Sequence, residues 1–426
     1  MTMSRGDRSF QVRSGSDRLV QLSPDVIPPI TGFGKLIAPG TLLVPKELVD
    51  AAGQDLIGDV FDNVTIEFAL DPGAMGASAV DNDDNWGIGP DGLDAGRFWD
   101  KGFRGQGVRI GIADSGLDST HPAFVDLVAE QRLSAFAQFD KSAVKQVQKN
   151  PDGSALPDSQ AVPTFSHWHG THCAGILVGQ PTDGKARGMA PAAELAVTRV
   201  LEQSNEGSVA GIGAGLWWLT EQHCQVVSIS LGWPGLHEEW AAPVEALLKD
   251  GVVVVAAVGN EFDVAGVAKS RSPANYLTVP ADDAAGILVC VGAHDRAGAV
   301  WDSSGGEVVN WSAVTVAQTD GSTRASRFAS VPARTVPVMV APGVDIISSI
   351  PGDKYLSSPG SSMATPHVAG LIALVLSGLR AHDPATRPRA AAELVLASLV
   401  DEGDPGVDIR FGGGRVDLDR LLASIG

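Results

Sequence analysis

Short apolar runs alternate with helix-like stretches along the chain from about residue 95 onward. The strand-like runs are 107–114, 194–201, 224–232, 251–260 and 286–293. Each is nearly continuous in apolar residues, as strands buried on both faces of a parallel sheet are. Residues 209–222 and 241–250 have the length and composition of helices. The alternation predicts an α/β fold, with a mostly parallel twisted sheet and helices on both faces.

The pattern before residue 81 is different and predicts a small, separate α+β extension over residues 1–80, followed by the main domain over residues 81–426. Residues 1–30 are polar and rich in Gly, Ser and Pro, so we expect a loose arm. The expected elements that follow are a strand at 34–44, a helix at 45–61 with Pro45 in its first turn, a strand at 63–70 and an exposed linker at 71–92.

Composition and charge restrict the partners. The formal net charge is −19 and the pI is about 4.8, so the basic surface that binds nucleic acid or anionic membranes is not expected. No run approaches the roughly 18 apolar residues of a membrane span. The polar N-terminus lacks an apolar signal-peptide core. These features predict a protein without nucleic-acid or membrane partners; they do not determine its oligomeric state.

The cysteines point to a reducing compartment. Cys173, Cys224 and Cys290 are the three cysteines of the chain, and each has apolar neighbours in sequence. An odd number without framework spacing predicts free, buried thiols. We therefore expect a cytoplasmic protein, with secretion by another route as the open alternative.

Polar residues at the ends of the apolar runs are the candidates for chemistry. Asp114, Ser230 and Asn260 each follow or end a predicted strand. Ligands of open parallel sheets bind beyond the carboxyl ends of the strands, so these residues should lie along one rim. His169 and Ser362 each stand at the start of an apolar helix-like run.

Each of these residues alone has an ordinary structural explanation. An Asp at a strand end commonly forms a turn, and a Ser before a helix commonly caps it. Together, Asp114, His169 and Ser362 supply the carboxylate, imidazole and hydroxyl of nucleophilic catalysis. The Asn260 amide could reach an oxyanion formed near Ser362. Pro366 is expected in the first turn of its helix, where an amide hydrogen has no helical partner.

These motifs resemble those of the subtilisin-like serine peptidases, with proteinase K-like features around His169. The similar stretches are DSG at 114–116, HGTHCAG at 169–175, SLG at 230–232, GN at 259–260 and GSSMATPHVAG at 360–370. Ser361 stands where the family has threonine, so the register identifies Ser362 as the nucleophile. The resemblance covers roughly residues 85–426.

The resemblance implies a serine endopeptidase that hydrolyses proteins or peptides through an acyl-enzyme. Its catalytic residues would be Asp114, His169 and Ser362, with Asn260 in the oxyanion hole. The substrate-binding positions that it implies are Gly207, Ser208 and Val209 on one strand, Ser230, Leu231 and Gly232 on the opposite edge, and Ala257, Val258 and Gly259 in a wall of the primary specificity pocket.

No cofactor is required by this reading, and no metal site is predicted. Structural calcium, common in relatives, is left open because Asp183 is the one obvious oxygen ligand in the matching loop. Two stretches, 128–159 and 301–325, are longer than in compact relatives; the first is expected to be a helical surface insert with a loop.

Alternatives remain for both parts of the chain. The main domain could be a catalytically silent peptide-binding module, or an esterase using the same three residues. The extension at 1–80 could be a propeptide that is removed, a regulatory unit, or a permanent structural domain.

Overall fold

The computed structural model describes five N-terminal strands and almost all of the main body. The described residues are 12–22, 35–38, 41–45, 57–67, 78–80 and 84–426, apart from 183–184, 186, 204–205, 277–284 and 318–321. The candidate site lies entirely within this described part.

The centre of the molecule is a seven-stranded sheet in the order β19-β14-β12-β10-β6-β8-β7, and each pair of neighbours is parallel. The expected α/β fold is therefore confirmed. The strands are β6 (Arg109–Asp114), β7 (Leu133–Gln138), β8 (Glu194–Arg199), β10 (Val226–Ile229), β12 (Val253–Ala257), β14 (Ile287–His294) and β19 (Met339–Pro342). All five strands predicted in the main body are among them.

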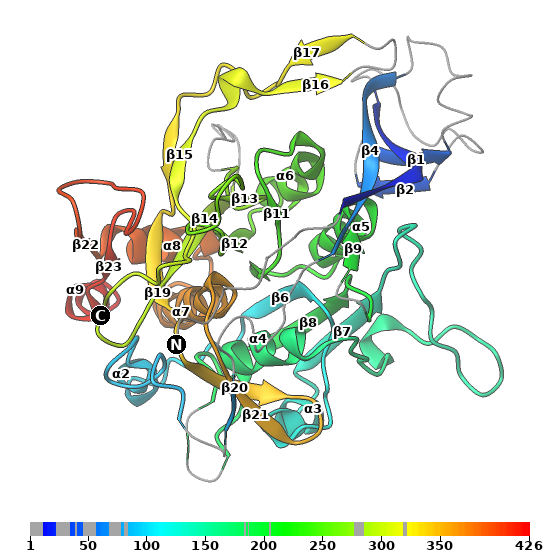
Figure 1. Ribbon diagram of the computed structural model, residues 1–426. Coiled ribbons are helices and arrows are strands. Elements are labelled where there is room, and N and C mark those ends of the chain that lie inside the picture. The colour runs from blue at the N-terminus through cyan, green and yellow to red at the C-terminus, as the bar shows by residue number, and fades with distance from the viewer. Residues whose placement is uncertain are drawn as a thin grey trace, which may run out of the picture.

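Helices cover both faces of this sheet, as Figure 1 shows. One core contains side chains of α4 (Trp168–Val178), α7 (Ser361–His382) and α8 (Pro388–Ala397), and the other contains those of α5 (Val209–Glu221) and α6 (Ala241–Lys249). Strand β12 contributes to both cores, because Val253 and Val255 face the first and Val254 faces the second. This alternation is why its sequence is apolar without a break.

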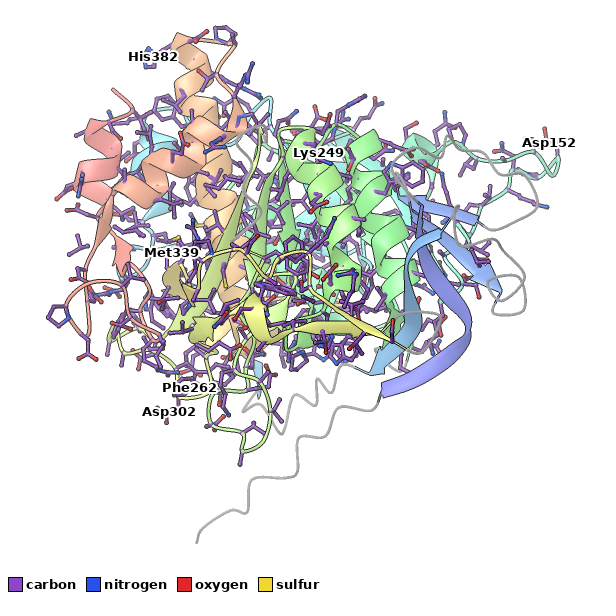
Figure 2. All side chains as sticks on the ribbon, turned by 90° about the horizontal axis from the view of Figure 1, so that it is seen from above. Asp152, Lys249, Phe262, Asp302, Met339 and His382 are labelled. Carbon is purple, nitrogen blue, oxygen red and sulfur yellow. The ribbon has the colours of Figure 1, made fainter. Side chains whose placement is uncertain are left out.

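Helix α7 is long and apolar enough to cross a membrane by length and composition, but 94% of its most apolar window is buried inside the protein. It contacts β10, β12, β14 and β19, and Figure 2 places His382 at its far end. The apolarity of α7 is that of a central core helix.

The N-terminal strands form a second sheet that is continued by a strand of the main body. Its order is β2-β3-β1-β4-β9, with β1 (Val12–Leu22), β2 (Lys35–Ala38), β3 (Thr41–Pro45), β4 (Ile57–Glu67) and β9 (Glu206–Ser208). Its strands β2 and β4 lie against α5, and β2 also contacts α6 (Figure 1).

Three expectations for this region are corrected. The loose arm at 1–30 contains β1, which is paired on both sides, with β3 and β4. The predicted helix at 45–61 runs into β4 at Ile57, while its residues 46–56 lie outside the described part. The predicted linker contains β5 (Ser78–Val80), which pairs with β21. Long-range pairing overrides the local sequence preference in each case.

The insert at 128–159 is also different from the expectation. After α3 (Val125–Ala129) it supplies the edge strand β7 and then an irregular loop, with Asp152 at the projecting tip (Figure 2). The loop is held by isolated bridges, such as Lys149 to Ala155, and not by a further α-helix.

Smaller elements complete the described part. They are α2 (Ala95–Asp100), α9 (Leu418–Ala423), β11 (Trp233–Pro234), β13 (Arg271–Ser272), β15 (Glu307–Val309), β16 (Thr315–Ala317), β17 (Thr323–Ala325), β18 (Arg334–Val336), β20 (Ile346–Ile350), β21 (Lys354–Ser358), β22 (Leu399–Val400) and β23 (Arg415–Val416).

Candidate active site

Asp114 and His169 form a buried hydrogen-bonded pair. Asp114 is the last residue of β6, His169 is the second residue of α4, and both side chains are at most 1% exposed. The His169 Nδ1 atom lies 2.9 Å from each carboxylate oxygen of Asp114. An ionised carboxylate can only accept, so Nδ1 carries the proton and Nε2 has its lone pair available.

The charge of His169 depends on this contact. Burial disfavours the imidazolium, but the Asp114 carboxylate outweighs burial and raises the pKa of His169 well above 6.5. Burial alone dominates at two other histidines, lowering the pKa of His172 to about 3 and that of His367 to about 4. His169 is thus the member of this buried group that can take up a proton near neutral pH.

Ser362 is the second residue of α7, and its Oγ donates to the carbonyl of Ser230 at 3.0 Å. Pro366 is the sixth residue of the helix, so the expectation that it lies in the first turn is wrong. Without an N–H, Pro366 leaves the carbonyl of Ser362, four residues earlier, without its helical donor. That carbonyl accepts instead from Ser230 Oγ at 2.8 Å and from Cys173 Sγ at 3.5 Å.

Cys173 connects His169 to the start of α7. Its Sγ lies 3.9 Å from each ring nitrogen of His169, one helical turn away. Burial raises the pKa of the thiol, so it is neutral at physiological pH. Within the described residues, Asp114, His169 and Cys173 also form the one group of potential metal ligands whose atoms converge, within 4.8 Å of one another. A neutral thiol and a hydrogen-bonded Asp–His pair are a poor donor set for an ion.

Asn260 and Ser361 join the end of β12 to the start of α7. The side-chain oxygen of Asn260 accepts from both the backbone N–H and the hydroxyl of Ser361, each at 2.9 Å. The hydroxyl in turn accepts from Gly259 N at 3.2 Å. Because the Asn260 oxygen Oδ1 accepts both bonds from Ser361, the Asn260 amide nitrogen Nδ2 points away from Ser361. Gly360 lies beside Nδ2. The sequence did not suggest this role for Ser361.

The predicted peptide-binding positions come from three segments of the main body. Leu231 and Gly232 follow β10 next to Ser230. Ala257 is the last residue of the neighbouring strand β12, and Val258 and Gly259 follow it. Gly207 and Ser208 belong to β9, but Val209 is the first residue of α5, so only part of that predicted strand is extended. β9 is paired with Thr65, Ile66 and Glu67 of β4.

A buried ion pair behind Asn260 was not expected. Arg271 Nε donates to Glu261 Oε2 at 3.1 Å, and a second contact joins Arg271 Nη2 to Glu261 Oε1. Glu261 Oε2 also accepts from Asn260 N at 2.9 Å. The two residues are ten positions apart, a spacing that has no local sequence signal.

The structure does not test whether the loop that contains Asp183 binds calcium. Asp183 lies outside the described residues, and the prediction made from it stays a prediction.

Comparison with known proteins identifies the family of the chain. The model of the subtilase family matches residues 105–414. The chain is 29% identical to subtilisin NAT of Bacillus subtilis subsp. natto over 65% of this chain and 57% of that protein. It is 30% identical to the major intracellular serine protease of Bacillus subtilis (strain 168), covering 67% and 73%, respectively.

A third relative is an intracellular serine protease of Paenibacillus polymyxa, at 29% identity over 70% of this chain and 75% of that protein. The chain spans just over half the length, 57%, of subtilisin NAT and of subtilisin E. Because the family model covers most of the main body, the chain belongs to the subtilase family.

Proposed function

We propose that this chain is a serine endopeptidase acting on proteins or peptides through an acyl-enzyme. The observation that carries the proposal is the buried Asp114–His169 pair, one helical turn from Cys173, whose sulfur touches the backbone of Ser362. Family membership and relatives named serine proteases support the same activity.

In the proposed mechanism, Ser362 Oγ attacks the carbonyl carbon of the scissile bond and its proton passes to His169 Nε2. Oγ now donates to the Ser230 carbonyl, so the mechanism requires it to turn toward His169; hydrogen bonds between catalytic groups commonly tighten when substrate binds. Asp114 keeps the proton on Nδ1 and stabilises the imidazolium. His169 then returns the proton to the leaving amine, and water releases the acyl group by the same route in reverse.

The negative oxygen of the tetrahedral intermediate would lie at the start of α7. Asn260 Nδ2 is one donor, since Ser361 holds its Oδ1. The backbone N–H of Ser362 is a second, because the first amides of a helix have no helical acceptor. The positive end of the helix dipole favours the same charge.

An extended peptide would bind between two edges. Ser230, Leu231 and Gly232 would pair with one side of it, and Gly207 and Ser208 with the other, by β-augmentation. Ala257, Val258 and Gly259 would form a wall of the pocket for the residue before the cut. The β4–β9 pairing supports the second edge, since it shows that β9 accepts an added antiparallel strand.

The test is covalent labelling combined with protein cleavage. A serine-directed fluorophosphonate should modify Ser362, as located by mass spectrometry, and should not modify Ser362→Ala. Cleavage of casein by the unmodified protein should disappear in the same variant. Labelling without casein cleavage would favour an esterase, and absence of labelling would favour a silent peptide-binding module; either result would refute the proposal.

We also propose that residues 1–80 are a built-in propeptide or regulatory unit for the domain at 81–426. The supporting observation is that β4 pairs with β9, the strand proposed here to bind the substrate. An intracellular place of action is supported by the free state of Cys173, Cys224 and Cys290 and by two relatives that are named intracellular serine proteases.

A further inference from the structure

Arg271 lies between the peptide-pairing edge that ends at Gly232 and the proposed wall of the primary specificity pocket that ends at Gly259. A Cβ atom added to Gly232 would lie 3.0 Å from Arg271 Cβ and 3.5 Å from its Cδ. A Cβ added to Gly259 would lie 2.9 Å from Arg271 Cγ. The side-chain stem of Arg271 therefore touches both segments and occupies space between them.

The backbone holds Arg271 in this place. Strand β13 pairs with β11, with Pro234 opposite Arg271, and Arg271 N donates to the carbonyl of Val258 at 2.9 Å. The residue is thus fixed to the chain just after Gly232 on one side and just before Gly259 on the other. Its position does not depend on the side chain alone.

Glu261 neutralises the guanidinium of Arg271. The side chains of Arg271 and Glu261 are 8% and 3% exposed, and they meet through two contacts. A buried, two-contact Arg–carboxylate pair is strongly oriented. Glu261 is held in addition by the backbone of Asn260, next to the proposed oxyanion site.

We propose that the Arg271–Glu261 pair shortens the primary specificity pocket and removes its net charge, so that the enzyme prefers peptides with a small uncharged residue, such as Ala, Ser or Gly, before the cut. This inference rests on the proposed endopeptidase function. A large side chain would have to displace the stem of Arg271. A charged one would be desolvated beside a pair that is already neutral.

The experiment compares peptide anilides that differ only in the residue before the cut: Ala, Phe, Glu or Lys. The wild-type kcat/KM for Ala should exceed that for each of the others by about tenfold or more, the discrimination that steric fit in such pockets provides. A wild-type preference for Phe, Glu or Lys would overturn the inference.

Two changes at the pair should alter this profile in different ways. Arg271→Ala/Glu261→Gln removes the stem and both charges, and should raise the Phe-to-Ala ratio of kcat/KM about tenfold. Glu261→Gln leaves Arg271 charged, and should raise the Glu-to-Ala ratio in a way that added salt reverses. Unchanged ratios in folded variants would count against the proposal.

A matched control and an active-site count separate the possible failures. Arg109→Ala/Glu194→Gln removes a half-buried Arg–Glu pair between β6 and β8, far along the sheet from Ser362, and should leave all ratios unchanged. Fluorophosphonate labelling of Ser362 measures the folded, competent fraction of each variant. If a variant does not fold, the wild-type ratios decide alone; if wild-type Ser362 is neither labelled nor active, the proposed function fails and this inference with it.

Discussion

The protonation of His169 is the residue-scale property that should set the pH dependence. Only the neutral imidazole accepts the proton of Ser362, and Asp114 raises the pKa of His169 well above its ordinary 6.5. kcat/KM should therefore rise with pH through an apparent pKa on the alkaline side of 6.5. Initial rates under first-order conditions, from about pH 5 to about pH 9, measure it.

Asp114→Asn provides the comparison. It removes the negative charge, so the midpoint should move to lower pH, and kcat should fall on the order of 10⁴-fold, as it does when such triads lose their carboxylate. A flat wild-type profile across this range, in enzyme that stays folded, would exclude His169 as the base.

Cys173 gives a second prediction at this scale. Its Sγ is 3.9 Å from both ring nitrogens of His169, so a mercurial bound to it would displace the imidazole. Mercurials should inhibit the wild type, and Cys173→Ala should remain active and become resistant. Cys224→Ala is the control, because Cys224 is equally buried but belongs to the other core cluster and should leave the sensitivity intact. Inhibition that persists in Cys173→Ala would disprove the idea.

At the scale of elements, the bond between the end of β12 and the start of α7 should matter for the rate. Ser361→Ala removes the hydroxyl that binds Asn260 Oδ1, and the amide then loses part of its orientation. One hydrogen bond contributes about 1 kcal/mol, so kcat should fall roughly fivefold while KM changes little. Ser361→Thr keeps the hydroxyl and should retain the wild-type kcat; a loss of equal size in both variants would point to a packing defect instead.

The elements also show what local sequence could predict. Asp114 lies on an apolar strand, and His169 and Ser362 lie on apolar helices. Each element overlaps the motif that identifies its residue, so the positions of these elements were predictable from the sequence. β1 was not, because its polar sequence becomes a strand only through pairing with β3 and β4. The donors that replace the missing amide of Pro366, and the Arg271–Glu261 pair, join segments that only the folded chain brings together.

On the scale of the whole molecule, buried histidines should make the fold sensitive to acid. The pKa values of His167, His294 and His367 are lowered to about 4, and that of His172 to about 3, chiefly by burial. Below about pH 6.5 these histidines bind more protons in the unfolded chain than in the folded one. Each histidine therefore lowers the free energy of unfolding by up to about 1.4 kcal/mol for each pH unit of acidification. His169, with its raised pKa, is protonated in both states below about pH 6.5, and its stabilising contribution is lost only as the pH rises above that value.

The net free energy of unfolding should therefore fall as the pH is lowered from about 6.5 to about 4. Urea titrations of Ser362→Ala measure it without self-digestion. His172→Gln should reduce the slope, since glutamine can donate to the Leu356 carbonyl that His172 now contacts at 2.9 Å. Stability that is constant or increases over this range would contradict the assignment of neutral, buried imidazoles.

The last prediction concerns the attachment of the extension to the main body. Residues 68–77 connect β4 to β5. Because β4 pairs with β9 and β5 pairs with β21, both of these strands are attached to the main body. If the extension is a propeptide, the intact chain should cut itself near this segment and lose its first ~70–95 residues, because linkers between docked elements are where chains are cut. Mass spectrometry of freshly purified and incubated protein follows the loss.

Ser362→Ala distinguishes self-cleavage from an outside protease. The variant should stay full length alone and should be cut when a trace of the wild type is added. Activity of the wild type should appear in step with the loss of β4 from β9, since the proposed substrate would pair with β9 in place of β4. If the wild type stays full length and is fully active, the β4–β9 pairing is a permanent part of the enzyme, and substrates must then bind without β9.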